Sequence, residues 1–266
     1  MPTILRTSYV FGPVKSRRLG TSLGINILPI GKKICSFNCI YCECGWNDAD
    51  VNENAIQDFS AFPKKEVIKY ELESALTEIN NSNIMLDVIT FSGNGEPTLH
   101  PNFAEIIDDT IELKNKFVPN THIAVLSNST NLHNEKIVSA LKKIEKPILK
   151  LDSANTNTFN KMNMFGMREN NSFVDKIIEG MKKFEGNFIF QIMFLRGFVD
   201  GKTIDNTTDS EVEDLIKVLI ETQPKQVMIY PVDRQTPAKN LIKLDKDEMI
   251  KIATKIEKSG FNVLYV

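Results

Sequence analysis

Outside one short segment the sequence lacks cysteine. The four cysteines of the 266-residue chain are Cys35, Cys39, Cys42 and Cys44. Structural disulfides usually join segments that are distant in the chain, so this distribution excludes a disulfide framework. Three thiolates with the spacing C-x3-C-x2-C on one loop can bind a single inorganic cluster, because thiolate is the usual protein ligand of iron–sulfur. Cys44 is left over, and we interpret it as an ordinary loop cysteine.

The sequence also lacks a long apolar run and a surplus of basic residues. It has no stretch of membrane-spanning length and no apolar leader, so we expect a cytoplasmic protein without a membrane partner. Lysine and arginine total 32 against 34 aspartates and glutamates, a formal net charge of −2. Proteins that bind tRNA or DNA through phosphates usually carry a basic surplus. The charge therefore weighs against a large polyanionic substrate.

Zinc is the alternative occupant of the cysteine loop. Structural zinc sites take four ligands, usually as two C-x2-C pairs that are well separated in sequence. Cys42 and Cys44 are one residue apart, which is too close for a second pair of that kind. We therefore favour iron–sulfur. A [4Fe–4S] cube with three protein ligands also leaves one iron open to a substrate.

The rest of the sequence alternates strand-length apolar runs with amphipathic stretches, which is typical of α/β proteins. The expected strands are 24–29, 86–92, 121–127, 147–152, 187–195 and 225–231, with a short final strand at 261–265. The expected helices are 64–80, 101–117, 134–145, 171–185, 209–222 and 245–258. Six βα units in succession predict a parallel sheet that is curled into a partial (β/α)6 barrel.

The length fits a single domain, 1–266. We expect a lead-in at 1–23, a barrel core at 24–231 and a C-terminal helix and strand at 232–266. In such barrels the chemistry lies at the carboxyl ends of the strands, and the cysteine loop follows the first expected strand. The segment 155–171 is long for a loop after a strand and is a candidate lid.

A second motif, Gly93-Asn94-Gly95-Glu96, follows the expected strand 86–92. Two glycines let the backbone approach a ligand closely, and a carboxylate can accept hydrogen bonds from an ammonium group. Taken alone, the motif also fits an ordinary turn between a strand and a helix.

The cysteine loop, with the aromatic Tyr41 just before its third cysteine, resembles that of the radical S-adenosylmethionine (radical SAM) superfamily. The resemblance implies that Cys35, Cys39 and Cys42 are catalytic and hold a [4Fe–4S] cluster. The cluster would bind S-adenosylmethionine and cleave it to a 5′-deoxyadenosyl radical, which abstracts hydrogen from a substrate. An electron donor of the flavodoxin or ferredoxin type is then also implied.

The same resemblance gives roles to the second motif. In the superfamily a Gly-Gly-Glu motif holds the methionyl amino group, and here Asn94 replaces its first glycine. We therefore expect Asn94, Gly95 and Glu96, together with Tyr41, to bind the cofactor. Polar side chains at later strand ends would bind its carboxylate and ribose hydroxyls, and these are Ser127, Asn128, Lys150, Asp152, Ser153 and Gln191. The alternative, that each satisfies nearby backbone groups, stays open.

Two segments carry candidate substrate residues. Arg17 and Arg18 precede the first expected strand, and Tyr230, Asp233 and Arg234 follow the sixth. Arginine suits phosphate or carboxylate oxygens because its guanidinium presents a planar fork of donors. Surface ion pairing is the alternative interpretation of each arginine.

Residues 11–24 and 93–101 resemble the wyosine-synthase-like branch of the superfamily, near which the queuine lyases of queuosine salvage lie. The mildly acidic charge, the lack of a basic extension and the lack of room for a second, RNA-binding domain favour radical chemistry on a small modified nucleoside or its phosphate, and lyase-type release of queuine from queuosine is one such reaction. Wyosine-type modification of tRNA is the alternative enzyme. A zinc or iron–sulfur module without catalysis is the alternative that is not an enzyme.

Overall fold

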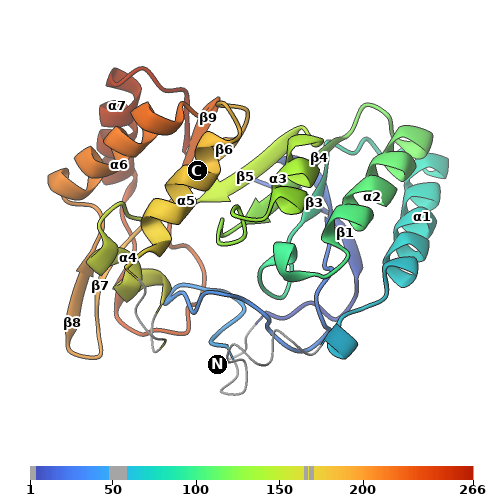
Figure 1. Ribbon diagram of the computed structural model, residues 1–266, viewed down its shortest axis with the longest axis horizontal. Helices are drawn as coiled ribbons and strands as arrows, with labels where there is room; N and C mark the ends of the chain where they lie inside the picture. Colours follow the sequence, from blue (N-terminus) through green and yellow to red (C-terminus); the bar gives the residue numbers. More distant parts are fainter. Residues whose placement is uncertain (1–3, 48–58, 165–166, 168–170, 266) are drawn as a thin grey trace.

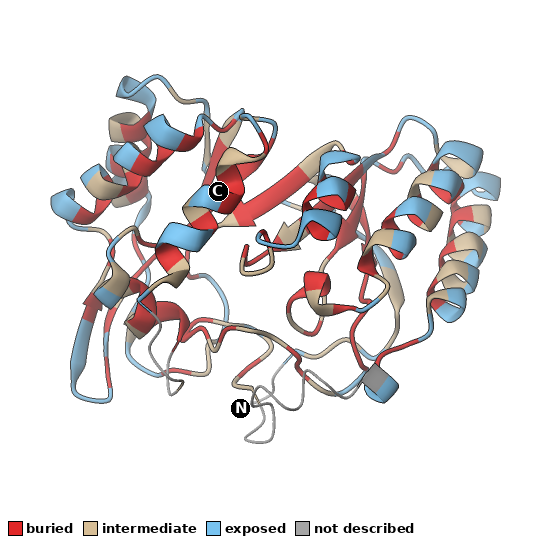
Figure 2. Ribbon diagram, viewed as in Figure 1, coloured by how far each residue is buried: buried red, intermediate tan, exposed pale blue. Residues whose placement is uncertain are grey.

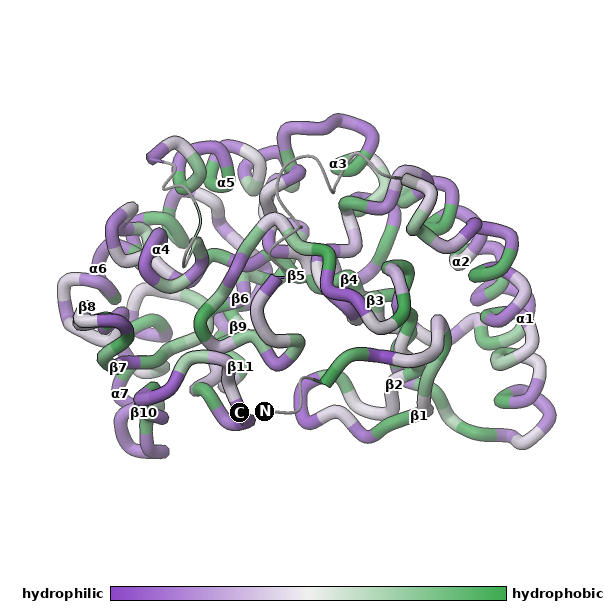
Figure 3. Tube along the Cα trace, turned by 90° about the horizontal axis from the view of Figure 1, so that it is seen from below, coloured by the Kyte–Doolittle hydropathy of each residue, from purple (hydrophilic) through white to green (hydrophobic). Residues whose placement is uncertain are grey.

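The computed structural model describes residues 4–47, 59–164, 167 and 171–265. Its main feature is an eight-stranded sheet with the order β1-β2-β3-β4-β5-β6-β9-β11, which curls into a partial barrel (Figures 1 and 3). All neighbouring strands in it are parallel except β1 and β2. The strands are β1 Val10–Ser16, β2 Gly20–Ile25, β3 Val88–Phe91, β4 His122–Ser127, β5 Lys146–Lys150, β6 Ile189–Phe194, β9 Gln226–Pro231 and β11 Val263–Tyr265. The predicted α/β partial barrel is confirmed.

Most of the helices lie on the outer, convex side of the sheet, each with one buried face and one exposed face (Figure 2). They are α1 Lys65–Asn81, α2 Phe103–Phe117, α3 Glu135–Lys142, α4 Thr156–Asn163, α5 Phe173–Lys182, α6 Asp209–Thr222 and α7 Lys246–Lys258. In α1 the buried residues Ile68, Leu72, Leu76 and Ile79 recur every three or four positions, as the amphipathic pattern requires. Within the described part of the chain, no helix is both long and apolar enough to cross a membrane.

The two faces of the sheet bury different clusters, because successive side chains of a strand point to opposite sides. Ile89 and Phe91 of β3 pack in the main core, together with side chains of the outer helices. The inward residues Val88, Ala124, Ile148, Ile189 and Met228 form a separate apolar cluster. Two positions further along four of these strands, the inward residues are Thr90, Lys150, Gln191 and Tyr230. The inside of the barrel therefore has an apolar floor and a polar layer towards the carboxyl ends.

The first parallel strand starts and ends earlier than predicted. The expected strand 24–29 is β2, Gly20–Ile25, because β1 pairs with it as an antiparallel hairpin in which Ser16 lies opposite Gly20. The predicted lead-in 1–23 thus contains an edge strand. Ile27 and Leu28 are 1% exposed although they lie after the strand. Buried apolar residues therefore continue past the end of β2, which is why the sequence places the end of this strand too late.

The other predicted elements agree with the structure to within a few residues, but α4 and a second sheet were, like β1, not predicted. The sequence predicts a loop and candidate lid at 155–171, but residues 156–163 form α4, whose N-cap Asn155 accepts from Asn157 N and Thr158 N. Residues 165–166 and 168–170 lie outside the described residues, so the lid stays a prediction. A three-stranded antiparallel sheet also follows β6. Its strands are β7 Arg196–Val199, β8 Lys202–Asp205 and β10 Leu241–Ile242.

Candidate functional site

The cysteine loop and the Gly93–Glu96 turn lie side by side as extended segments. Ile34 N donates to Asn94 O (2.8 Å), and Glu96 N donates to Ile34 O (3.0 Å). Between these bonds Gly95 has a φ of +135°, and a Cβ at this position would lie 1.7 Å from Ile34 O. Only glycine fits there. The second glycine of the motif thus permits the approach that brings the two motifs together.

Glu96 has a buried carboxylate whose orientation is fixed by four donors. Its Oε1 accepts from Thr98 N (3.1 Å), Thr98 Oγ1 (2.6 Å) and Ser127 Oγ (2.9 Å), and its Oε2 accepts from Asn128 N (2.6 Å). Burial raises the pKa of Glu96, and these hydrogen bonds oppose that rise. A carboxylate oxygen has two lone pairs, so Oε2 can accept one further bond from a ligand.

Asn128, at the end of β4, also contacts the cysteine loop. Its Nδ2 donates to Ser36 Oγ (2.9 Å) and lies 3.6 Å from Cys35 Sγ. Together with the bond from its backbone nitrogen to Glu96, this connects the first cysteine and the motif carboxylate through one residue. The sequence predicted cofactor-binding roles for Ser127, Asn128 and Glu96 at strand ends; the structure brings the three together, and their binding of the cofactor stays a prediction.

The Asn94 side chain hydrogen-bonds with backbone groups and is not exposed to solvent. It is fully buried, accepts from Arg6 N (2.7 Å), and donates to Arg6 O (3.0 Å) and Pro29 O (2.9 Å). Two residues earlier, Ile4 N donates to Glu43 O (3.1 Å). The segment around Arg6 therefore crosses from the cysteine loop to the second motif, and a direct role of the Asn94 side chain in cofactor binding stays a prediction.

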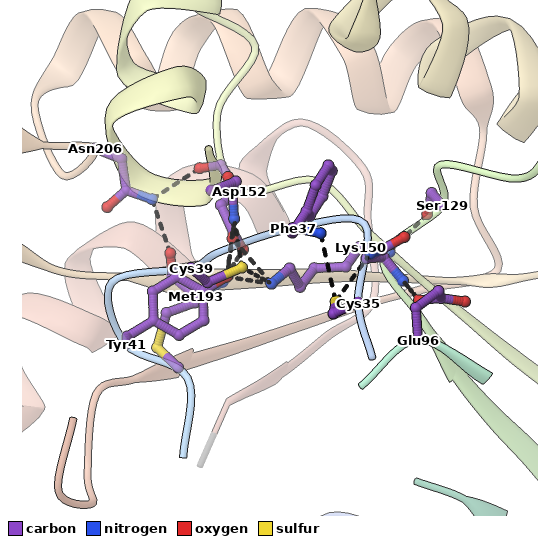
Figure 4. A network of polar contacts seen from close by, with 12 residues as sticks. Cys35, Phe37, Cys39, Tyr41, Glu96, Ser129, Lys150, Asp152, Met193 and Asn206 are labelled. Carbon is purple, nitrogen blue, oxygen red and sulfur yellow. Dashed lines mark hydrogen bonds and ion pairs between the residues drawn. The ribbon is translucent and has the colours of Figure 1, made fainter. Parts of the chain in front are cut away.

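A second polar network surrounds Cys39 (Figure 4). The Lys150 side chain extends from the end of β5 towards Cys39 and Tyr41, with its Nζ 3.7 Å from Cys39 Sγ and 3.3 Å from Asp152 Oδ2. Tyr41 Oη donates to Asp152 and accepts from Lys150. Asn163 Nδ2, at the end of α4, donates to Asp152 Oδ2 (2.8 Å) and lies 3.3 Å from Cys39 Sγ. Four polar residues thus meet at Cys39: Tyr41, Lys150, Asp152 and Asn163.

Asp152 is the most constrained member of this network. Its Oδ1 accepts from Met193 N (3.0 Å), and Asn206 Nδ2 donates both to Asp152 O (2.7 Å) and to Met193 O (2.8 Å). Asn206 therefore clamps the ends of β5 and β6 together. Burial disfavours the ammonium of Lys150, but Asp152 and the Cys39 thiol outweigh it and raise the pKa of Lys150 well above its ordinary value.

The four cysteines are free thiols, and Lys33 lies among them. Lys33 is 2% exposed and its Nζ donates to Gly45 O (2.7 Å). Burial lowers the pKa of Lys33, but negative charge on the neighbouring cysteine sulfurs, Cys42 first, raises it above its ordinary value. A hydrogen bond from Cys44 lowers the pKa of Cys42, and Cys44 Sγ also donates to Gly93 O (3.3 Å).

The donor set of the loop fits an iron–sulfur cluster. Cys35, Cys39 and Cys42 supply three unpaired thiols from one segment, and Lys33 supplies a positive charge beside them. In the described part of the chain, no three His, Cys, Asp or Glu side chains lie close enough together to hold a single metal ion.

The remaining predicted residues lie further from the thiols. Ser153 Oγ donates to Glu211 Oε2 on α6 (2.6 Å), and Gln191 Nε2 lies 3.7 Å from Met228 Sδ. At the rim, Arg17 pairs with Asp233 (2.6 Å) and Arg234 pairs with Glu43 (2.6 Å). Arg18 lies 4.7 Å above the ring of Tyr230. Arg234 thus contacts the cysteine loop through Glu43, but the cofactor or substrate role of each of these residues stays a prediction.

The sequence did not predict a site role for Lys33 beside the thiols, for Thr98 and Ser36 in the network of Glu96, or for Asn163 and Asn206 in the network of Cys39. A lysine two positions before the first cysteine was a usable signal. Asn163 and Asn206 carried none, because one ends an unpredicted helix and the other follows an unpredicted hairpin.

Comparison with known proteins gives a family match. A family model described as Radical SAM superfamily matches residues 31–219. A Brachyspira hyodysenteriae protein named GTPase Obg is 32% identical over 248 residues, which cover 93% of this chain and 33% of that protein. A UPF0026 protein of Helicobacter pylori is 28% identical over 242 residues, 91% of this chain and 71% of that protein. The chain thus spans only a third of the length of the Brachyspira protein.

Among solved structures, a radical SAM methyltransferase from Sphaerobacter thermophilus has the same fold. It superposes with a TM-score of 0.63 at 14% identity, and the match covers 92% of this chain and 66% of the methyltransferase. At this identity the likeness concerns the fold. The Brachyspira relative is named a GTPase, but the sequence of the present chain contains no G-x-x-x-x-G-K-S/T phosphate-binding loop.

Proposed function

The chain belongs to the radical SAM superfamily, and we propose that it is an enzyme that transforms a small modified nucleoside or nucleoside phosphate. Its cofactors are those of the superfamily, a [4Fe–4S] cluster and S-adenosylmethionine. When bound, they supply reductive cleavage of a carbon–sulfur bond and a carbon radical that abstracts hydrogen. Cys35, Cys39 and Cys42 would hold the cluster.

The connected contacts from Cys35 through Asn128 to Glu96 support the cofactor-binding part of this proposal. A methionyl ammonium needs a buried anion of fixed orientation close to the open iron, and Oε2 of Glu96 meets that need. The backbone donor of Asn128 and the Ser127 hydroxyl keep the carboxylate from rotating. A preorganised acceptor of this kind binds without the cost of reorganising its own surroundings.

Tyr41 and the strand end of β5 would form the wall opposite Glu96. The phenol is held by Asp152, Lys150 and Asn163, so the ring keeps one position beside Cys39. A fixed aromatic face suits the adenine of the cofactor, and a fixed polar wall excludes loose water from the radical.

The arrangement of charge at the rim favours a small substrate over tRNA. Arg17 and Arg234 are paired with Asp233 and Glu43, and Lys243 also pairs with Asp233. Cations that are neutralised in this way contribute little to binding a phosphate backbone. Queuine release from queuosine is the reaction that we propose first, on the resemblance of residues 11–24 and 93–101 described above.

The test uses anaerobically reconstituted protein with S-adenosylmethionine, dithionite and either queuosine, its 5′-phosphate or tRNA. We expect 5′-deoxyadenosine to form in step with consumption of the small molecule, and RNase to leave the rate unchanged. Activity with intact tRNA alone, falling steeply with salt, would replace this proposal by the wyosine-type reaction. A colourless protein that contains zinc and no iron would exclude the enzyme altogether.

A further inference from the structure

The open side of the barrel is bridged by two adjacent arginines. Arg17 and Arg18 lie in the turn between β1 and β2, at one edge of the parallel sheet, and both reach the end of β9 near its other edge. Arg17 Nη2 pairs with Asp233 Oδ2 (2.6 Å), and the Arg18 guanidinium lies 4.7 Å from the centre of the Tyr230 ring. Two neighbouring residues of one type thus meet different partners.

The two arginines differ in charge balance and burial. Arg17 is exposed, and its charge is neutralised by Asp233. Arg18 is half-buried, and among the residues that the structure describes no carboxylate lies within 4.0 Å of its guanidinium. Arginine stays protonated at any physiological pH, so this charge is not removed by burial. A partly dry guanidinium without a counter-ion is a strong attractor of an anion.

Tyr230 connects Arg18 with the polar layer inside the barrel. It lies on the inward face of β9, opposite Met193 of β6 in the register of the two strands. Its ring supports the guanidinium through a cation–π contact. Burial raises the pKa of the Tyr230 hydroxyl, and Lys150, Asp152 and Arg18 also act on it electrostatically. The free charge is therefore close to the network beside Cys39, unlike the paired cations of the rim.

We propose that Arg18 and Tyr230 form a subsite that binds the phosphate or carboxylate group of the substrate at the open side of the barrel. A guanidinium presents two parallel N–H groups to an oxyanion, and the tyrosine fixes the plane in which they lie. Arg17 and Arg234 have no such role, because their carboxylate partners already occupy them. This inference rests on the proposed function, since it assigns the anionic end of that substrate.

The probe is inorganic pyrophosphate, which carries the oxyanion chemistry without the nucleoside. It is titrated by calorimetry into anaerobic holoenzyme saturated with S-adenosylmethionine, as wild type and as Arg18→Ala, Arg18→Lys and Arg17→Ala. We expect Arg18→Ala to weaken pyrophosphate binding by about ten- to a hundredfold and Arg18→Lys to weaken it less. Arg17→Ala, the matched control from the same turn, should stay within about twofold of wild type. Circular dichroism and iron content confirm that each variant is folded and loaded.

Three results would overturn the subsite. The first is no pyrophosphate binding by the wild type at millimolar concentration, and the second is an equal loss of pyrophosphate affinity in Arg17→Ala and Arg18→Ala. The third is a loss of S-adenosylmethionine affinity in Arg18→Ala with pyrophosphate binding unchanged. The last would assign Arg18 to the methionyl carboxylate instead. The titration needs no turnover. If no nucleoside reacts, the proposed function is contradicted, but the pyrophosphate titration still shows whether Arg18 binds an anion.

Discussion

Lys33 donates a hydrogen bond to the carbonyl oxygen of Gly45 (2.7 Å) from inside the loop that carries all four thiols. A positive charge buried beside a cluster stabilises its reduced, more negative state. We therefore expect Lys33→Met to make the midpoint potential of the [4Fe–4S] cluster more negative by about tens of millivolts. Potentiometric titration followed by electron paramagnetic resonance measures the shift.

Lys32→Met is the matched control for that experiment, since Lys32 is the preceding residue and is more exposed. Its potential should move much less. Equal shifts in the two variants would mean that net charge, and not the buried position of Lys33, sets the potential.

The second prediction concerns the ligands. Alanine at Cys35, Cys39 or Cys42 should abolish the anaerobic iron–sulfur spectrum and S-adenosylmethionine cleavage, because each removes one of three thiolates. Cys44→Ala should spare both, although it removes the donor to Gly93 O. If the Cys44 variant lost iron to the same extent, our ligand assignment would be wrong.

The third prediction concerns Glu96. Glu96→Gln removes the charge that would meet the methionyl ammonium, a contact of about 1.5–3 kcal/mol. S-adenosylmethionine should bind about tenfold or more weakly in calorimetry, with the cluster spectrum intact. Ser127→Ala removes only one of the donors to Glu96 and should have a smaller effect. An unchanged affinity in Glu96→Gln would remove Glu96 from the site.

The fourth prediction uses two glycines with positive φ. Alanine at Gly95 would place its Cβ 1.7 Å from Ile34 O, whereas alanine at Gly201, with a φ of +76°, would meet no atom within 4 Å. Both changes strain the backbone by about 1 kcal/mol or more, but only Gly95→Ala also separates the cysteine loop from the second motif. Iron content after reconstitution should fall in Gly95→Ala alone. Full iron loading of that variant would show that the loop does not need this contact.

The fifth prediction is a pH dependence of stability. His100 is buried and neutral, because Nδ1 accepts from Asn102 N (3.0 Å) and Nε2 then donates to Pro63 O (2.9 Å). Burial lowers the pKa of His100 below its ordinary value of 6.5. The unfolded chain therefore takes up the proton first, and the free energy of unfolding decreases as the pH falls below about 6.5, by up to about 1.4 kcal/mol per pH unit.

Urea unfolding at pH 7.5 and pH 5.5 measures this dependence in wild type, His100→Gln and His133→Gln. The difference between the two pH values should shrink in His100→Gln. It should be unchanged in His133→Gln, because His133 lies at an exposed position. A wild-type difference that survives in His100→Gln would assign it to other groups.

The sequence could predict the barrel because its evidence is local. Apolar periodicity marks the helices that pack on the sheet, and α6 was predicted as 209–222 and occurs at Asp209–Thr222. The cysteine spacing likewise lies within one loop. The β1–β2 hairpin was missed because β1 is an edge strand with mostly exposed side chains, which gives it little apolar signal.

The contact partners of individual polar residues could not be predicted from the sequence in the same way. Arg17 and Arg18 are the same residue type at adjacent positions, and only the folded chain gives one a carboxylate and the other an aromatic ring. Asn163 and Asn206 act through partners more than ten residues away, on elements that carry no motif. Such pairings depend on tertiary packing, which spacing along the chain does not encode.

Asn94 makes two hydrogen bonds with the backbone of Arg6, and these limit how far the protein can be shortened at its amino end. A truncation that removes Arg6 leaves a buried amide without its partners, directly beside the turn that carries Glu96. Ile4 is tied in the same way to Glu43 of the cysteine loop. Expression variants are therefore best trimmed no further than residue 3, with an affinity tag attached at the carboxyl end, where the last described strand, β11, adds to the sheet edge away from these contacts.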